Sequence, residues 1–142
     1  MSAVEPSAAV LGSYELPIKS EEDIVVVRRK VRALAQARKL DSFAVAALTT
    51  AASELTRNVW VHAGGGSALL EELADGRRYG VRATFIDQGP GISDLQRALA
   101  GGFSTTKTMG LGLSGSRRLV DAFEIQTGPS GTRIQIEKWG RG

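Results

Sequence analysis

The chain has 142 residues, of which 42% are hydrophobic, and a formal net charge of +3 at pH 7. This length suits one globular domain with one hydrophobic core. The lack of cysteine excludes a disulfide scaffold and a thiolate metal site, and no apolar run is long enough for a signal peptide or a membrane span. The basic residues are spread along the chain, which suits anionic ligands without indicating nucleic-acid binding. We therefore expect a soluble, cytoplasmic protein that binds neither nucleic acid nor membrane.

The first part of the chain is predicted to contain one strand and one helix. Residues 1–12 carry no pattern and are expected to be a flexible extension, which leaves a single domain over residues 13–142. A strand is predicted over residues 13–18. Ser20, followed by three acidic residues, is expected to cap a helix that reaches about Lys39. A cluster of basic residues on the polar side of this helix is most typical of a solvated surface: Arg28, Arg29, Lys30 and Arg32.

A second helix and a hairpin follow. Asp41 or Ser42 is expected to cap a helix that reaches about Ala63, because three glycines come next. Residues 67–74 would suit a helix or a strand. The Asp75-Gly76 pair decides for a hairpin, since it is a strong two-residue turn signal, and the second strand is predicted over residues 77–87.

The C-terminal part is predicted to be one helix and two strands. The helix is expected over residues 111–122, and the strands over residues 123–127 and 132–138. In the last strand, Ile134 and Ile136 alternate with polar residues, which predicts that one face is buried. The order β-α-α-β-β-α-β-β implies an α/β two-layer sandwich, with a mixed, mostly antiparallel sheet and helices on one face.

Asp87 is the first candidate for a functional residue. It has the same parity as Val81 and Phe85 in the second hairpin strand, so its carboxylate should point into the layer between sheet and helices. A buried carboxylate is costly unless it meets donors. Gly89 and Gly91 would leave room for a planar ligand against the backbone, although a plain strand end followed by a turn would also give this pattern.

Glu54 and Asn58 form a second candidate site on the second helix. They are one turn apart at the margin of the apolar stripe and should border the core. A carboxylate there can accept a proton, and a carboxamide oxygen can ligate Mg²⁺. The alternative is an exposed polar pair. His62 continues the same line, and a histidine near a helix end is more typically a packing or capping group.

A glycine-rich stretch, Gly110-Leu111-Gly112-Leu113-Ser114-Gly115, opens the third predicted helix. It fits the dinucleotide pattern G-x-G-x-x-G, which is weak alone. A dinucleotide fold needs a strand leading directly into the glycines and a second βα half, and the sequence has neither. Glycines at the start of a helix nevertheless suit a phosphate group, because backbone N–H groups there point at the anion.

These elements together resemble a known family. Glu54-x-x-x-Asn58, Asp87-x-Gly89-x-Gly91, Gly110-Leu111-Gly112-Leu113 and Gly131-Thr132 are similar, in order, to the four nucleotide-binding elements of the GHKL ATPase and kinase superfamily. The segments 52–58, 102–105 and 137–139 resemble the small RsbT-type serine/threonine kinases of bacterial partner-switching systems. The resemblance covers nearly everything from residue 13 onward.

The resemblance implies a role for each matching residue. Asp87 would accept the adenine amino group of ATP, with Thr132 near the same edge of the base, while Gly89 and Gly91 allow close approach. Asn58 would hold Mg²⁺ against the phosphates. Glu54 would take the proton of the incoming serine hydroxyl. The phosphates would meet the helix start and the preceding loop: Thr105, Lys107, Gly110, Leu111, Gly112 and Leu113. Lys107 stands where relatives often carry glycine, so it could equally be a solvated loop residue.

The resemblance also implies partners. The substrates would be STAS-domain antagonist and scaffold proteins, as in a stressosome, with a PP2C-type phosphatase or a sigma-factor pathway regulated downstream. The alternative is a binding module, either an anti-sigma factor or a non-catalytic ATP-binding switch. Glu54 favours the enzyme, because a pure binder needs no general base. Trp60 could anchor a partner or pack under a loop.

Overall fold

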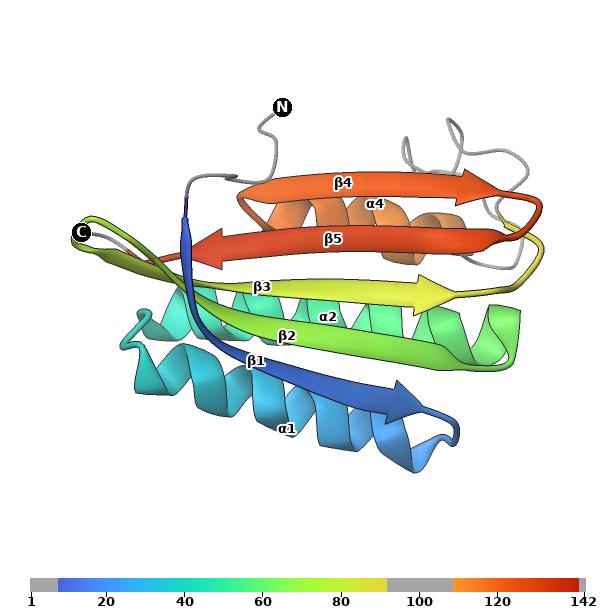
Figure 1. Cartoon of the computed structure of the whole chain (residues 1–142), viewed down its shortest axis with the longest axis horizontal. Helices are drawn as coiled ribbons and strands as arrows, with labels where there is room; N and C mark the ends of the chain where they lie inside the picture. The colour runs from blue at the N-terminus through green and yellow to red at the C-terminus, as the bar shows by residue number, and fades with distance from the viewer. Residues whose placement is uncertain (1–7, 92–108, 141–142) are drawn as a thin grey trace.

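The protein forms one five-stranded antiparallel sheet with three described helices on one face (Figure 1). The structure is a computed structural model and describes residues 8–91 and 109–140, with side chains in the last helix from residue 113 onward. The strand order is β1-β2-β3-β5-β4, and all four pairings are antiparallel. The predicted α/β two-layer sandwich is therefore confirmed. The elements are β1 Ala9–Ile18, α1 Glu22–Ala37, α2 Ser42–Ala63, β2 Gly66–Asp75, β3 Arg78–Asp87, α4 Met109–Leu119, β4 Ala122–Gly128 and β5 Gly131–Trp139.

Strand β1 begins four residues earlier than predicted, so residues 9–12 belong to the sheet rather than to an extension. The pairing of β1 with β2 shifts between Val10 and Gly12. This irregularity interrupts the alternation of side chains along the strand. The sequence pattern therefore does not indicate where the strand begins. Residues 1–7, the rest of the expected extension, lie outside the described residues.

The helix ends are partly as predicted. Ser20 does not cap α1, because the residue before the helix is Glu21 and makes no side-chain capping bond. The α2 predictions are confirmed: the Asp41 Oδ1 atom accepts a hydrogen bond from the Ala44 N–H at 2.8 Å, and Gly64 ends the helix with φ 77°. Helix α4 ends three residues before the predicted limit, and β4 follows after two residues.

The hairpin prediction is confirmed. Residues 67–74 lie in β2, and Asp75 pairs with Arg78 across a two-residue turn. Gly76 in this turn has φ 64°, a conformation that favours glycine. The hairpin carries β3 through the middle of the sheet, so Val81, Ala83 and Phe85 are all buried against the helices.

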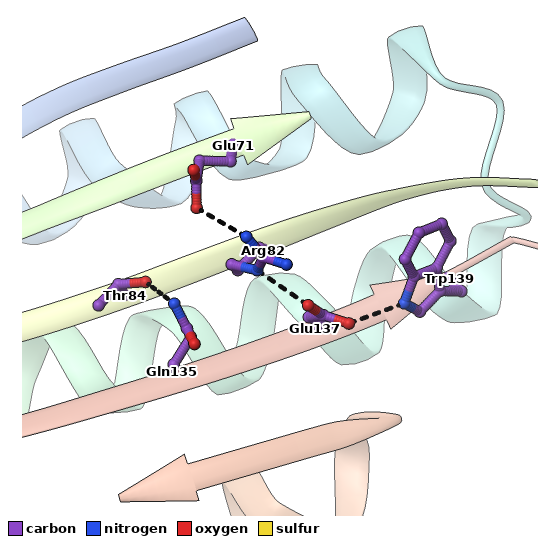
Figure 2. Close-up of polar contacts among 6 residues, drawn as sticks. All are labelled: Glu71, Arg82, Thr84, Gln135, Glu137 and Trp139. Carbon is purple, nitrogen blue, oxygen red and sulfur yellow. Dashed lines mark hydrogen bonds and ion pairs between the residues drawn. The ribbon is translucent and has the colours of Figure 1, made fainter. Parts of the chain in front are cut away.

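The sheet face opposite the helices is more buried than the alternation in β5 predicted. The alternation predicted one buried face, with Ile134 and Ile136, but Gln135 and Glu137 on the other face are also only 8% and 1% exposed, because their neighbours in the sheet cover and pair them. Figure 2 shows the contacts: Arg82 donates to Glu137 at 2.8 Å and Glu71 accepts from Arg82 at 3.4 Å. Gln135 likewise donates to Thr84 at 2.9 Å, and the Trp139 indole donates to Glu137 at 3.0 Å.

The end of the sheet formed by Asp87 and Gly131 adjoins the C-terminal end of α2. Helices α1 and α2 run antiparallel, so the start of α1 lies at this same end (Figure 1). No helix in the described ranges is long and apolar enough to cross a bilayer. The sheet and the helical layer enclose one hydrophobic core between them.

Candidate functional site

A pocket lies at this end of the molecule, between the C-terminal part of α2, the end of β3 and the start of β5. It brings together four residues that the sequence singled out: Asn58, Asp87, Gly91 and Thr132. Its other walls are mostly apolar, which suits the flat face of an aromatic ring. These other lining residues are Leu55, Val59, His62, Ala63, Phe85, Pro90 and Ile134.

Asp87 occupies the sheet side of the pocket, one strand repeat after the buried Phe85. Its Oδ1 atom accepts a hydrogen bond from the Gly89 N–H at 2.9 Å. This bond fixes the carboxylate, and no other residue in the described ranges donates a hydrogen bond to it. The second oxygen is therefore available to an amino group entering the pocket.

Thr132 lies beside Asp87, because the two residues are direct partners in the pairing of β3 with β5. Its side chain is 7% exposed, and its hydroxyl is 2.8 Å from the hydroxyl of Thr127. A carboxylate and a hydroxyl on adjacent strands can recognise one edge of a planar ligand. The two residues were predicted to act at the same edge, and the register brings them together.

The glycines near Asp87 have reasons within the protein itself. A Cβ atom on Gly89 would lie 2.8 Å from the Cβ of Ala63, so this glycine lets the turn pack against the end of α2. Gly91 has φ 85°, and a Cβ there would overlap the carbonyl oxygen of Gly128. Gly131 has φ 150°, and its Cβ would overlap the carbonyl oxygen of Asp87. The glycines therefore shape the pocket, and close approach of a ligand to them remains a prediction.

Asn58 supplies the clearest sign of a missing partner. Its side chain lines the pocket, and its Nδ2 atom is buried with no hydrogen-bond partner in the described part of the protein. A buried unsatisfied polar atom costs about 1–3 kcal/mol. A carboxamide can turn to present oxygen or nitrogen, so Asn58 fits a polar ligand or a hard cation in the pocket.

Glu54 lies one turn before Asn58 on α2 and does not line the pocket. Its side chain is exposed, so the expectation that it borders the core is wrong, because no described element covers this side of the helix there. An exposed carboxylate next to the pocket can still reach a group that arrives from solvent. His62 is also exposed, at the pocket wall. Trp60 packs against the core cluster and is half-buried, which favours the packing interpretation over a free anchor.

Residues 110–113 form the first turn of α4, which begins at Met109. The backbone of the glycine-rich stretch is thus at a helix N-terminus, as predicted. Leu113 is fully buried and anchors this turn in the core. Thr105 and Lys107 lie outside the described residues. The polar motifs of the sequence did not predict the apolar wall of the pocket. The four-residue spacing of Leu55 and Val59, which puts both on one side of α2, could have indicated it.

The match to protein families agrees with this arrangement. Residues 18–138 match the family model of the histidine kinase-like ATPase domain. Because the match covers most of the chain, this protein belongs to that family of ATP-binding domains. Two solved structures share the fold. The RsbU and RsbW domains of Rv1364c from Mycobacterium tuberculosis give a TM-score of 0.64 at 21% identity, over 92% of this chain and 33% of that one. The SiaB–SiaC complex from Pseudomonas aeruginosa gives 0.57 at 17% identity, over 92% and 90%.

A relative in the same superfamily is closer in sequence. The chain is 40% identical over 125 residues to the serine/threonine-protein kinase RsbT of Bacillus subtilis (strain 168). This similarity covers 87% of this chain and 94% of that protein. The chain therefore belongs to the RsbT-type serine/threonine kinases, and the resemblance seen in its motifs is confirmed.

Proposed function

We propose that this protein transfers the γ-phosphoryl group of ATP to a serine or threonine hydroxyl of a STAS-domain protein in a bacterial partner-switching module. The juxtaposition of Asp87, Thr132 and Asn58 in one pocket is the observation that carries the ATP-binding part. Membership of the RsbT-type kinases supports the transfer step. A protein that uses ATP in this way is expected in the cytoplasm.

Adenine recognition is proposed for the sheet side of the pocket. The free oxygen of Asp87 would accept the exocyclic amino group, and the Thr132 hydroxyl would meet the same edge of the ring. The apolar wall formed by Leu55, Val59 and Ile134 would cover the ring faces. This arrangement selects a base with a donor at the carboxylate, since a carbonyl there would face a second acceptor.

The phosphates are proposed to lie between Asn58 and the start of α4. The buried, unsatisfied amide of Asn58 fits a Mg²⁺ ligand that presents oxygen, and such a cation would neutralise the phosphate charge. The free N–H groups in the first turn of α4, at Gly110 and Leu111, would donate to the terminal phosphates, and Gly112 and Leu113 would complete this turn. Thr105 and Lys107 are proposed to contribute from the loop before α4.

Glu54 is proposed as the general base. The substrate hydroxyl oxygen attacks the γ-phosphorus, the new O–P bond forms, and the P–O bond to the departing ADP breaks. Glu54 accepts the hydroxyl proton. Its exposure suits this role, because the hydroxyl must arrive on another protein. Loss of such a base costs about 100-fold to 10,000-fold in rate.

Partner proteins are proposed at two levels. STAS-domain antagonist and scaffold proteins would be the phosphoryl acceptors, and a PP2C-type phosphatase would be regulated by contact. The second candidate is a module that binds ATP and acts by sequestering a partner such as a sigma factor. The exposed carboxylate of Glu54 beside the pocket favours the enzyme.

The test is incubation with labelled ATP, Mg²⁺ and a STAS-domain protein. We expect label in the STAS protein on a serine or threonine, stable to mild acid. ATP binding without any transfer would overturn the kinase proposal and leave the binding module.

A further inference from the structure

We propose that the outer surface of the helical layer is the docking site for an acidic surface of the protein substrate. This inference rests on the proposed kinase function, because it concerns how a substrate protein is brought to Glu54. Helices α1, α2 and α4 lie side by side on one face of the sheet (Figure 1). The surface is made by their exposed side chains. We call it the helical surface. Its charged and apolar members are Val26, Arg28, Arg29, Arg32, Phe43, Arg57, Val61, Arg117 and Arg118.

The first argument is charge. Six exposed arginines lie within the described parts of the three helices, against two exposed glutamates, Glu22 and Glu54. None of the six arginines makes an ion pair with another residue in the described ranges. Arg78 and Arg82 of the sheet differ, because they pair with carboxylates at 3.3 Å and 2.8 Å. Among the described residues, the largest group of exposed cations without an ion pair therefore lies on the helical surface.

The second argument is local stability. Arg28 and Arg32 are four residues apart on α1, where two like charges destabilise a helix by a few tenths of a kcal/mol. Arg29 lies between them in sequence and adds to the repulsion. Within residues 8–91 and 109–140, no ion pair uses these three charges. A feature that weakens the helix and serves no contact within the protein fits an external ligand of opposite charge.

The third argument is residue type. Every exposed cation on the three helices is arginine, and the one lysine of these helices, Lys30, lies over the Tyr14 ring at 4.1 Å. Arginine is enriched and lysine depleted in protein interfaces, because the planar guanidinium binds carboxylates with two parallel hydrogen bonds. A merely solvated surface has no need of this preference.

Exposed apolar side chains accompany the arginines. Phe43 is 78% exposed, Val61 is 59% exposed and Val26 is 47% exposed. On α2, Phe43, Arg57 and Val61 lie on one side of the helix, along about 27 Å at 1.5 Å per residue. An aromatic side chain among arginines is the usual composition of a protein-binding surface.

The occupant is a protein with an acidic patch. A second copy of this chain would place arginines against arginines, which opposes association. The phosphates of a duplex nucleic acid would pair with the arginines but would leave Phe43 without an apolar contact. Glu54 lies on the same helix, one turn from Arg57, so a protein held on this surface has its hydroxyl groups near the proposed base.

The test compares two charge reversals of equal size. Arg29→Glu lies on the helical surface, whereas Arg77→Glu lies in the exposed β2–β3 turn at the end of the sheet away from Asp87. In transfer from ATP to a STAS-domain protein, Arg29→Glu should raise the KM for that protein about 10-fold at about 50 mM salt, with kcat and the KM for ATP unchanged. Arg77→Glu should change neither constant. At about 500 mM salt the difference between the variants should shrink, because salt screens exposed charges.

Equal KM values for Arg29→Glu and Arg77→Glu would overturn the docking proposal while leaving the kinase function standing. If the wild-type chain transfers no phosphoryl group, the kinase proposal fails, and calorimetric affinity for the same STAS protein then decides the docking question between the two variants. Equal affinities, or no affinity of the wild type, would overturn it. Loss of binding to a DNA duplex or to phosphatidylglycerol vesicles in Arg29→Glu, with STAS affinity retained, would also overturn it and assign the surface to that ligand.

Discussion

Asp87 and Thr132 are direct cross-strand partners at the end of β3 and the start of β5, and both side chains line the pocket beside α2. They are 45 positions apart in sequence, and only the antiparallel register of two central strands joins them. Because Gly89 holds one oxygen of Asp87, the carboxylate is oriented before a ligand arrives. In the proposed complex, the pocket would meet one edge of the adenine ring with a carboxylate that is already oriented.

The Asp87→Asn variant tests this recognition. The amide would present a donor where the adenine amino group needs an acceptor, or would lose its bond from the Gly89 N–H. We expect ATP affinity to fall by about 10-fold to 100-fold, as for loss of a charge-assisted hydrogen bond of about 1.5–3 kcal/mol. Calorimetry with ATP measures it, and circular dichroism checks that the variant is folded. Unchanged affinity in a folded variant would remove the assignment of Asp87 to adenine.

Asn58→Leu should separate ligand binding from stability. Its buried Nδ2 atom has no partner among described residues, so an apolar side chain of similar size should leave the free energy of unfolding unchanged or raise it by about 1 kcal/mol. The dependence of ATP affinity on Mg²⁺ should be lost. Urea denaturation and ATP titrations with and without Mg²⁺ give the two results. A variant that is less stable yet keeps its Mg²⁺ dependence would show that Asn58 is a structural residue.

Gly91→Ala should destabilise the protein. Gly91 has φ 85°, and a Cβ there would overlap the carbonyl of Gly128, so we expect a loss of about 1–3 kcal/mol from backbone strain and displacement. Gly115→Ala is the matched control. Gly115 lies inside α4, a Cβ there meets no atom within 4 Å, and alanine should stabilise the helix by about 1 kcal/mol. Thermal unfolding gives the melting temperature of each variant. A shift of both melting temperatures in the same direction would contradict the account.

Glu72 gives a prediction about pH. The Tyr14 hydroxyl donates to Glu72 at 2.6 Å and the Arg38 guanidinium at 2.8 Å, and these contacts lower the pKa of the Glu72 carboxyl from its usual 4.5. A carboxyl with a lowered pKa in the folded state stabilises the fold above its unfolded pKa, and this stability is lost as the pH falls through the folded pKa. Glu72→Gln should therefore be less stable than wild type at pH 7, and the difference should narrow below about pH 4.5. Urea denaturation at pH 7 and below about pH 4.5 measures the difference in the free energy of unfolding between the two proteins. A difference that widened in acid would contradict the lowered pKa of Glu72.

Local patterns predicted the parts of the site that depend on a single element. The parity of β3 placed Asp87 on the helix side, and the helical repeat placed Asn58 at the margin of the apolar stripe of α2. Both residues line the pocket. The burial of Gln135 and Glu137 could not be predicted in this way. Their partners, Thr84 and Arg82, come from another strand, and alternation along one strand does not report which side chains the neighbouring strand supplies.

The sequence left open whether Glu54 borders the core or is exposed, for a related reason. A residue at the margin of an apolar stripe is buried only if a neighbouring element covers that margin, and the sequence of α2 alone does not contain that information. The start of β1 was hidden because the irregular pairing near Gly12 breaks the alternation on which strand prediction depends.

Phosphoryl transfer by the Glu54→Gln variant is the measurement that tests the central claim most directly. Glutamine keeps the size of the side chain but cannot accept the hydroxyl proton. With labelled ATP, Mg²⁺ and a STAS-domain protein, the wild type should label a serine or threonine in an acid-stable bond. Glu54→Gln should bind ATP normally and transfer about 100-fold to 10,000-fold more slowly. Transfer at the wild-type rate would contradict the general-base role, and acid-labile label on His62 of this chain would contradict the serine/threonine kinase itself.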